Sequence, residues 1–360
     1  MNVRDLSAEW RSEWDEFCRE SPDAWFRHTT DWLDYTLNYK PEFDPASESF
    51  MVTHSKEIIA VCPLILETVD GVRQFTYAGG YGPTPAFSAD LSEGERDTIE
   101  GMIFDEVDER AAEHGVQRVK MQHPSLAEET PTGTESYNYL VRHGFVDTSI
   151  HTQLVDLDRD IDDIRADLRR DYRRSIDDAA DTFEATVFDS ENVTESIHDQ
   201  YKQCHIKDAG GQTRPDETFE MMYDWITADE AFLVGAKYEG EYVGFSYFLA
   251  YDGGVYYASS ARDPDSDTYD LGIGHLLQWE AMKWMVERGL DTYEPGWQFF
   301  DRTFPHLASD KEVNISQFKR GVGGTTRPLS RGEKYYDGDL FREEYTEKVE
   351  RYAEYLETGG

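Results

Sequence analysis

The sequence is poor in cysteine and has no long apolar run. Cys18, Cys62 and Cys204 are its only cysteines, and without a CxxC pair they argue against a disulfide framework or a cysteine-rich metal site. The longest apolar run, residues 58–66, contains Pro63 and is far too short to cross a bilayer. The first residues do not read as a signal peptide, so we expect a cytoplasmic protein without a membrane span.

Basic residues are also scarce. Asp and Glu number 74 against 35 Lys and Arg, which gives a formal net charge of −39. The acids are dispersed and aromatic residues make up 14% of the chain, which is not the composition of a disordered protein. A densely carboxylated surface stays hydrated in concentrated salt, so we expect a halophilic protein, as in a haloarchaeal cytosol. Such a surface hides the usual basic signal of nucleic-acid binding, and we expect no DNA partner.

One order of predicted elements occurs twice along the chain. It consists of three strands joined by tight turns, then a loop, a helix closed by glycine, and a further strand. The first copy has predicted strands over 50–53, 58–66, 73–78 and 116–122, with the helix ending at Gly115. The second has predicted strands over 231–238, 242–251, 255–261 and 291–294, with the helix ending at Gly289. Identity between the copies, offset by about 180 residues, is slight, so order and spacing carry the duplication, and such runs also arise by chance in α/β chains.

The duplication predicts an α/β protein of two tandem units, each with a mixed sheet flanked by helices. We place the first unit at residues 1–155 and the second at 156–330. Residues 331–360 contain a last amphipathic helix, over about 340–356, which we expect to pack back on the first unit.

Five arginines stand within ten residues of a predicted helix over 161–183. They are Arg165, Arg169, Arg170, Arg173 and Arg174. In so acidic a chain this cluster favours recognition of phosphate or another anion, which we assign to the last four. The alternative is that these arginines pair with the neighbouring aspartates, Asp167 and Asp171 among them.

A glycine turn precedes the helix of the second copy. Glycines at Gly272 and Gly274 let a phosphate approach the backbone, and the free N–H groups of a helix start favour an anion. No GKS or GKT follows, which excludes a P-loop, and no third glycine stands where a dinucleotide fingerprint requires it. Glycine at a helix start can also be a matter of local geometry alone.

Two further positions are candidates for catalysis. Lys319, in the run from Phe318 to Gly324, is suited to stabilise an oxyanion or a phosphate, although a lysine before a turn is often only solvated. His205 is a possible base, although a helical histidine is more often a packing residue. The histidines lack metal-ligand spacing, so we expect no metal, and no G-x-S-x-G motif is present.

The chain resembles the duplicated members of the GNAT acyltransferase superfamily, in particular the FemAB-like peptidyltransferases and a related acetyltransferase domain. The resemblance covers most of the chain. Five stretches carry it: residues 24–32, 168–174, 271–281, 287–290 and 318–324.

The resemblance implies two GNAT-like units packed side by side and transfer of an acyl or aminoacyl group to a primary amine. FemAB-like enzymes use an aminoacyl-tRNA and a cell-wall precursor, and the related acetyltransferase domain is assumed to use acyl-CoA. The family's Phe-Lys pair falls on Phe318 and Lys319, where the lysine is thought to stabilise developing negative charge. The implied donor site comprises Leu271, Gly272, Ile273 and Gly274, together with backbone groups of the third strand around Tyr257 and Ala258.

Some features depart from the family. Tyr269 stands where GNAT enzymes have Arg or Gln before the CoA-binding turn, and no segment matches the long tRNA-binding hairpin of FemA-type enzymes. A haloarchaeal host would also lack ordinary murein. We therefore expect an N-acyltransferase with acyl-CoA as cosubstrate, no bound cofactor, and as acceptor a primary amine of a small molecule or of a sugar or peptide precursor. The alternatives are an aminoacyl-tRNA-dependent transferase, in which the arginine cluster grips tRNA, and a non-catalytic GNAT-like binding protein.

Overall fold

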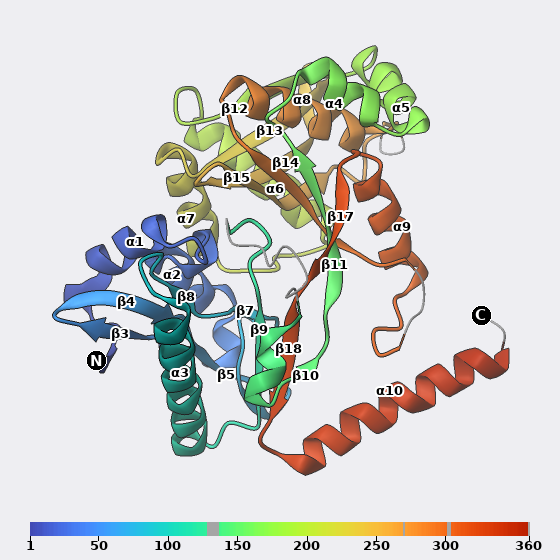
Figure 1. Ribbon diagram of the computed structural model, residues 1–360. Helices are drawn as coiled ribbons and strands as arrows, with labels where there is room; N and C mark the ends of the chain where they lie inside the picture. Colours follow the sequence, from blue (N-terminus) through green and yellow to red (C-terminus); the bar gives the residue numbers. More distant parts are fainter. Residues whose placement is uncertain (128–136, 269–270, 301–303, 359–360) are drawn as a thin grey trace. The chain divides into compact units, whose positions relative to one another are not determined.

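The computed structural model describes residues 1–127, 137–268, 271–300 and 304–358 (Figure 1). Its contacts divide the chain into two compact units. Unit 1 comprises Met1–His151, Phe299–Val313 and Pro328–Gly360, and unit 2 comprises Thr152–Gln298 and Asn314–Arg327. The chain thus leaves each unit and returns to it, whereas the sequence suggested three consecutive segments ending at residues 155, 330 and 360.

Unit 1 contains two sheets. A four-stranded sheet has the order β1-β3-β4-β8, and a larger one has the order β10-β18-β9-β6-β5-β2, with β7 paired to β9. The strands are β1 (Asn2–Asp5), β2 (Ala46–Ser47), β3 (Phe50–His54), β4 (Glu57–Cys62), β5 (Ile65–Val69), β6 (Val72–Phe75), β7 (Gly82–Pro83), β8 (Ala86–Phe87), β9 (Arg118–Gln122), β10 (Val146–Asp147) and β18 (Arg331–Tyr335).

The α-helices of unit 1 are α1 (Arg11–Glu20), α2 (Thr30–Tyr39), α3 (Glu93–His114) and α10 (Gly338–Thr358), and its 3-10 helices are η1 (Ala8–Trp10), η2 (Phe26–His28), η3 (Pro41–Phe43) and η4 (Tyr139–His143). Local chemistry explains the ends of α3. Ser92 and Glu95 form a capping box at its start, and Gly115 ends it with a left-handed φ of 65°. Its apolar face, which includes Ile99, Ile103 and Val107, is buried in the core of the unit.

Unit 2 is built on one sheet of order β12-β13-β14-β15-β16-β11-β17. The strands are β11 (Ile150–Asp156), β12 (Glu184–Phe188), β13 (Ala231–Tyr238), β14 (Glu241–Tyr251), β15 (Gly254–Arg262), β16 (Thr292–Gln298) and β17 (Thr325–Leu329). The helices are α4 (Ile161–Asp167), α5 (Arg170–Ala180), α6 (Glu195–Asp208), α7 (Asp216–Thr227), α8 (Ile273–Glu287) and α9 (Asp310–Arg320), whose first residues belong to unit 1.

Helices cover both faces of the unit 2 sheet. On one face, Trp284 of α8 packs on Phe232, with ring centroids 4.1 Å apart. On the other face, Tyr201 of α6 stacks on Tyr247, whose hydroxyl donates to the Met222 carbonyl of α7 at 2.7 Å. Because side chains alternate between the faces of a strand, the two helix pairs bury two separate sets of residues of one sheet.

The predicted double order is confirmed, with two local corrections. The expected strand over 58–66 is two strands of different sheets, β4 and β5, because Pro63 has no N–H to continue the ladder. The expected helix over 161–183 is two helices, α4 and α5, because Leu168 and Arg169 are extended, with ψ of 140° and 142°. Among the described residues, no helix has the length and apolarity needed to cross a membrane.

Candidate active site

Two neighbouring parallel strands of unit 2 pair only at their beginnings. β15 and β16 are matched at Gly254 and Thr292, Val255 and Tyr293, and Tyr256 and Glu294. Beyond that point β15 runs on to Arg262 and β16 to Gln298 without further pairing to each other. The strands therefore diverge after Glu294, which leaves backbone groups on their facing edges for another partner.

A β-bulge lies at this divergence. The pairing of β14 with β15 shifts between Tyr247 and Phe248, so Ala258 has no Cα partner and is exposed. Tyr257, the other residue predicted for the donor site on this strand, is not exposed in this way, because its ring packs against Phe248 in the core. Burial raises the pKa of the Tyr257 phenol, and Ser260, Ser246 and Gln278 lie near it. Of these two predicted residues, only Ala258 lies at the surface of the divergence.

The start of α8 offers free backbone donors. Its N-cap is Gly272, with a left-handed φ of 71°, and no side chain of the described residues caps the helix. Its first turn contains no acidic residue, whereas the first turn of α3 in unit 1 carries Glu93 and Glu95 and is closed by the capping box. In a chain with 74 acids, this helix start has the features of an anion site. Leu271, just before it, is 50% exposed, and Tyr269 lies outside the described residues.

The end of α9 brings Phe318 to the start of α8. A Cβ on Gly274 would lie 3.5 Å from Phe318 Cζ, which is ordinary contact. The Phe318 ring also meets the rings of His275 and Tyr172, with centroids 5.0 and 5.6 Å away. Phe318 therefore fixes the end of α9 against α8 and α5, and the adjacent Lys319 is positioned by this packing.

Lys319 lies against the diverging part of β16. A Cβ on Gly296 would stand 2.7 Å from Lys319 Nζ, so the ammonium group lies close to the Gly296 backbone, whose φ of 108° favours glycine. The structure records no hydrogen bond or ion pair of Lys319 with any described residue. Burial lowers the pKa of Lys319, and the charge of Glu294 partly offsets this effect. An ammonium group with few partners, close to diverging strands, is suited to meet negative charge that develops on a ligand.

The predicted arginine cluster is divided between paired and free residues. Arg169 is paired with Asp171 at 2.5 Å and also donates to the Gln317 carbonyl, while Arg173 donates to the Ala166 carbonyl at 2.7 Å. Arg170 and Arg174, one turn apart on α5, are exposed and make no hydrogen bond or ion pair with the described part of the chain. Both interpretations of the sequence thus apply, each to different arginines.

His205 lies on α6, on the sheet face opposite α8. Its Nε2 is 3.0 Å from Thr213 Oγ1, and its ring contacts those of Tyr201 and Phe219. Burial lowers the pKa of His205 to about 4, so the imidazole is neutral near pH 7. None of its recorded contacts within the described residues reaches Lys319 or Glu294, so the structure does not bring His205 together with the other predicted catalytic residues.

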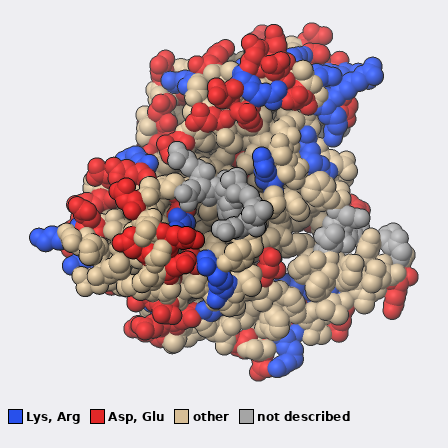
Figure 2. Space-filling view, viewed as in Figure 1, with Lys and Arg blue, Asp and Glu red and all other residues tan. Residues whose placement is uncertain are grey.

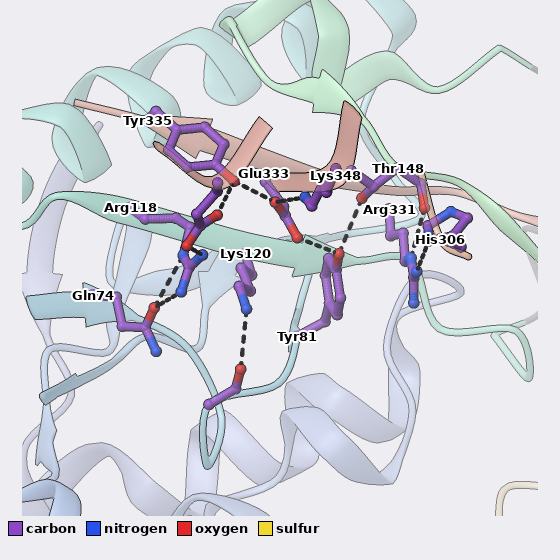
Figure 3. A network of polar contacts seen from close by, with 12 residues as sticks. Gln74, Tyr81, Arg118, Lys120, Thr148, His306, Arg331, Glu333, Tyr335 and Lys348 are labelled. Carbon is purple, nitrogen blue, oxygen red and sulfur yellow. Dashed lines mark hydrogen bonds and ion pairs between the residues drawn. The ribbon is translucent and has the colours of Figure 1, made fainter. Parts of the chain in front are cut away.

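The corresponding place in unit 1 is filled by the chain itself. β6 and β9 pair at Gln74 with Arg118 and at Phe75 with Val119, and then β7 takes the edge of β9. A polar network holds this region (Figure 3). Tyr81, just before β7, donates to Glu333 at 2.7 Å and lies 3.1 Å from the Thr148 hydroxyl. Unit 2 is therefore the unit in which the diverging strands stay unfilled by β-strand pairing.

Several residues of this site were not predicted from the sequence. Glu294 is the one charged residue of β16, and it could have been noticed in the sequence, since a buried carboxylate usually has a specific role. Gly296, Tyr172 and His275 gave no comparable signal, because their importance comes from contacts with the distant α9.

The order of three strands, a helix and a further strand in both units, with diverging parallel strands in unit 2, is that of a duplicated GNAT fold of the FemAB-like type. Residues 163–304 match the acetyltransferase (GNAT) domain family. This part of the chain is thus a GNAT-type acyltransferase domain, as the sequence resemblance implied.

Solved structures support the same fold. FemX is 16% identical, with a TM-score of 0.66 over 95% of this chain and 99% of its own. L-PGS from Bacillus licheniformis is 16% identical, with a TM-score of 0.53 over 92% of this chain and 98% of its own. A tandem GNAT protein from the clavulanic acid biosynthesis pathway is 11% identical, with a TM-score of 0.51 over 93% and 98%. No curated protein sequence matches the chain.

Proposed function

We propose that the protein is an N-acyltransferase that moves an acyl group from acyl-CoA to a primary amine of a small molecule or of a sugar or peptide precursor. The observation that carries the proposal is the start of α8 beside the diverging strands of unit 2: its first turn contains no acidic residue, and no described side chain caps it. A pyrophosphate at this helix start would be met by N–H groups and the helix dipole. The thioester would then lie along β15 near Ala258.

In this proposal Lys319 stabilises the oxyanion. When the amine attacks the thioester carbonyl, negative charge develops on oxygen, and a positively charged group that no described residue pairs with lowers the energy of that state. The packing of Phe318 on Gly274 and His275 supports this role, because it holds Lys319 beside the helix that would bind the donor. The acidic composition further supports a cytoplasmic location in a halophilic host.

The alternative donor is an aminoacyl-tRNA. Its specific support is the pair of free, exposed cations Arg170 and Arg174 on α5, in a chain of net charge −39. FemX and L-PGS share the fold at low identity, so they support the alternative only as structural analogues. The phosphates of tRNA and of CoA could both bind these arginines. The two donors differ in how steeply their binding depends on salt concentration.

A ligand-dependent thermal shift tests the proposal. The melting temperature is measured in molar KCl with acetyl-CoA, longer acyl-CoAs, free CoA or aminoacylated tRNA. A ligand at a hundredfold excess over Kd stabilises the native state by about 2.7 kcal/mol. We expect the shift with CoA compounds to vanish in Gly274→Asp, which places a carboxylate at the start of α8, and to persist more fully in the neutral control Gly274→Asn.

The outcomes separate the donors. The double variant Arg170→Glu/Arg174→Glu is compared with wild type for both donors. If it keeps its thermal shift with CoA compounds but loses more of its tRNA binding, acyl-CoA is the favoured donor. No shift with any CoA compound, together with salt-sensitive tRNA binding that the double charge reversal abolishes, would replace it by the tRNA-dependent reaction. Binding of a donor without transfer to any amine would instead indicate a non-catalytic binding protein.

A further inference from the structure

Glu294 lies on β16, beside the opening between β15 and β16. It occupies the last paired position of β16, opposite Tyr256, at the point where β15 and β16 diverge. A Cβ on Gly296 would lie 3.9 Å from the ring of Tyr256, the residue paired with Glu294, so this side of Gly296 and the Glu294 side chain share one face of the sheet. Lys319 Nζ approaches Gly296 from that face. A carboxylate and an ammonium group therefore flank the opening on one side of the sheet.

Glu294 is held by one hydrogen bond from the described residues. Its side chain is buried, with an exposed fraction of 4%. One oxygen, Oε1, accepts a hydrogen bond from Thr152 Oγ1 at 2.5 Å. The described residues provide no hydrogen bond to the other oxygen and no ion pair within 4.0 Å from Lys319. This second oxygen is not among the buried polar atoms that lack a partner, so water or a ligand can reach it.

We infer that Glu294 is the proton acceptor for the amine, with its free oxygen directed at the attacking nitrogen; this inference rests on the proposed function. The amine nitrogen attacks the donor carbonyl carbon, a C–N bond forms, and the carbonyl π electrons move to oxygen beside Lys319. Glu294 takes a proton from the nitrogen. The C–S bond of a thioester, or the C–O bond of an ester donor, then breaks with its electron pair on the leaving atom, which receives that proton.

Two observations favour Glu294 over His205 in this role. Glu294 shares its strand face with Gly296 and Lys319, whereas the recorded contacts of His205 are with Thr213 and aromatic rings on α6 and α7. The Thr152 hydrogen bond also fixes the orientation of the carboxylate, which general-base catalysis requires.

The test compares Glu294→Gln with wild type and with Glu287→Gln, a matched change of an exposed carboxylate at the end of α8. Glutamine keeps an acceptor for Thr152 but cannot take a proton. With acetyl-CoA and either ethanolamine or the weakly basic trifluoroethylamine, we expect Glu294→Gln to lower kcat by about 10²–10⁴-fold. We also expect the acidic limb of the kcat–pH profile to disappear and the loss to be smaller for the less basic amine, while the acetyl-CoA thermal shift stays unchanged.

A second variant guards against a purely structural effect. Thr152→Val removes only the hydrogen bond that orients Glu294, so we expect a smaller fall in kcat and a shifted acidic limb. A wild-type kcat and pH profile in a folded Glu294→Gln protein would overturn the inference and leave the proposed function intact. Failure of the wild-type protein to transfer acetyl groups to either amine, despite binding acetyl-CoA, would contradict the proposed function and the inference with it.

Discussion

Lys319 is partly buried in the folded protein, and nearby negative charge offsets the loss of its hydration only in part. Burial lowers its pKa, and the Glu294 carboxylate raises it only in part. A lysine whose pKa is lower in the folded state than in the unfolded state destabilises the fold while it is protonated. This destabilisation is fully present below the folded pKa and is relieved as the pH rises from the folded pKa toward the ordinary value for lysine. Such a cost is expected where a charge serves a reaction.

Replacing this lysine should separate stability from activity. We expect Lys319→Met to raise the melting temperature at pH 7 and to lower kcat by about 10²–10³-fold, the usual effect of losing one oxyanion donor. The gain in stability should shrink at alkaline pH, where the wild-type lysine is neutral. Calorimetry and a transfer assay check both effects, with Lys311→Met, an exposed lysine of the same helix, as the control. A less than tenfold fall in kcat would show that Lys319 does not stabilise the oxyanion.

At the scale of elements, the glycines after α9 set how closely its end approaches α5. A Cβ on Gly321 would clash with the Tyr172 ring, and the Gly321 carbonyl accepts a hydrogen bond from the Arg169 N–H at 3.1 Å. Tyr172 is fully buried and packs on Phe318. The same contact therefore ends α4, begins α5 and positions the Phe318-Lys319 pair.

Adding one methyl group at this contact should disturb it measurably. We expect Gly321→Ala to destabilise the protein by about 1–3 kcal/mol, as overpacking of a tight core does, because both Tyr172 and the Phe318 carbonyl must move. Activity should fall as well, since Lys319 moves with its helix. Gly101→Ala in α3 is the control: nothing lies within 4 Å of the new methyl, so its effect should be neutral or stabilising by up to about 1 kcal/mol. Equal unfolding free energies of the two variants in urea would contradict this account.

The same contact shows how far the sequence predicts the fold. Periodicity and turn residues gave the double order of elements, but the single strand expected over 58–66 missed the break between β4 and β5 at Pro63. The break at Leu168–Arg169 contains no proline or glycine that would mark it in the sequence. It is held instead by a hydrogen bond to Gly321, about 150 residues later in the chain. Likewise the motif containing Lys319 was recognisable, but its approach to Gly296 and Glu294 depends on packing between segments far apart in sequence.

At the scale of the whole molecule, acidic side chains dominate the charge. Figure 2 shows them scattered over the visible face, with Lys and Arg fewer among them. The net charge of −39 implies strong self-repulsion of the compact state, since the charges are closer together when folded than when unfolded. Some basic residues are used in local pairs, such as Arg110, which binds Asp5 and Glu106.

Salt should therefore stabilise the protein. The Debye length falls from about 10 Å at 0.1 M to about 3 Å at 1 M ionic strength, so added KCl screens the repulsion between carboxylates. We expect the melting temperature to rise steeply between 0.1 and about 2 M KCl and to rise less at pH 4, where many carboxylates are protonated and less repulsion remains to be screened. Scanning calorimetry at both pH values checks this, with sucrose as an uncharged control for general exclusion from the surface. A melting temperature independent of KCl at pH 7 would show that the acidic composition does not limit folding, and the proposal of a halophilic host would lose its physical basis.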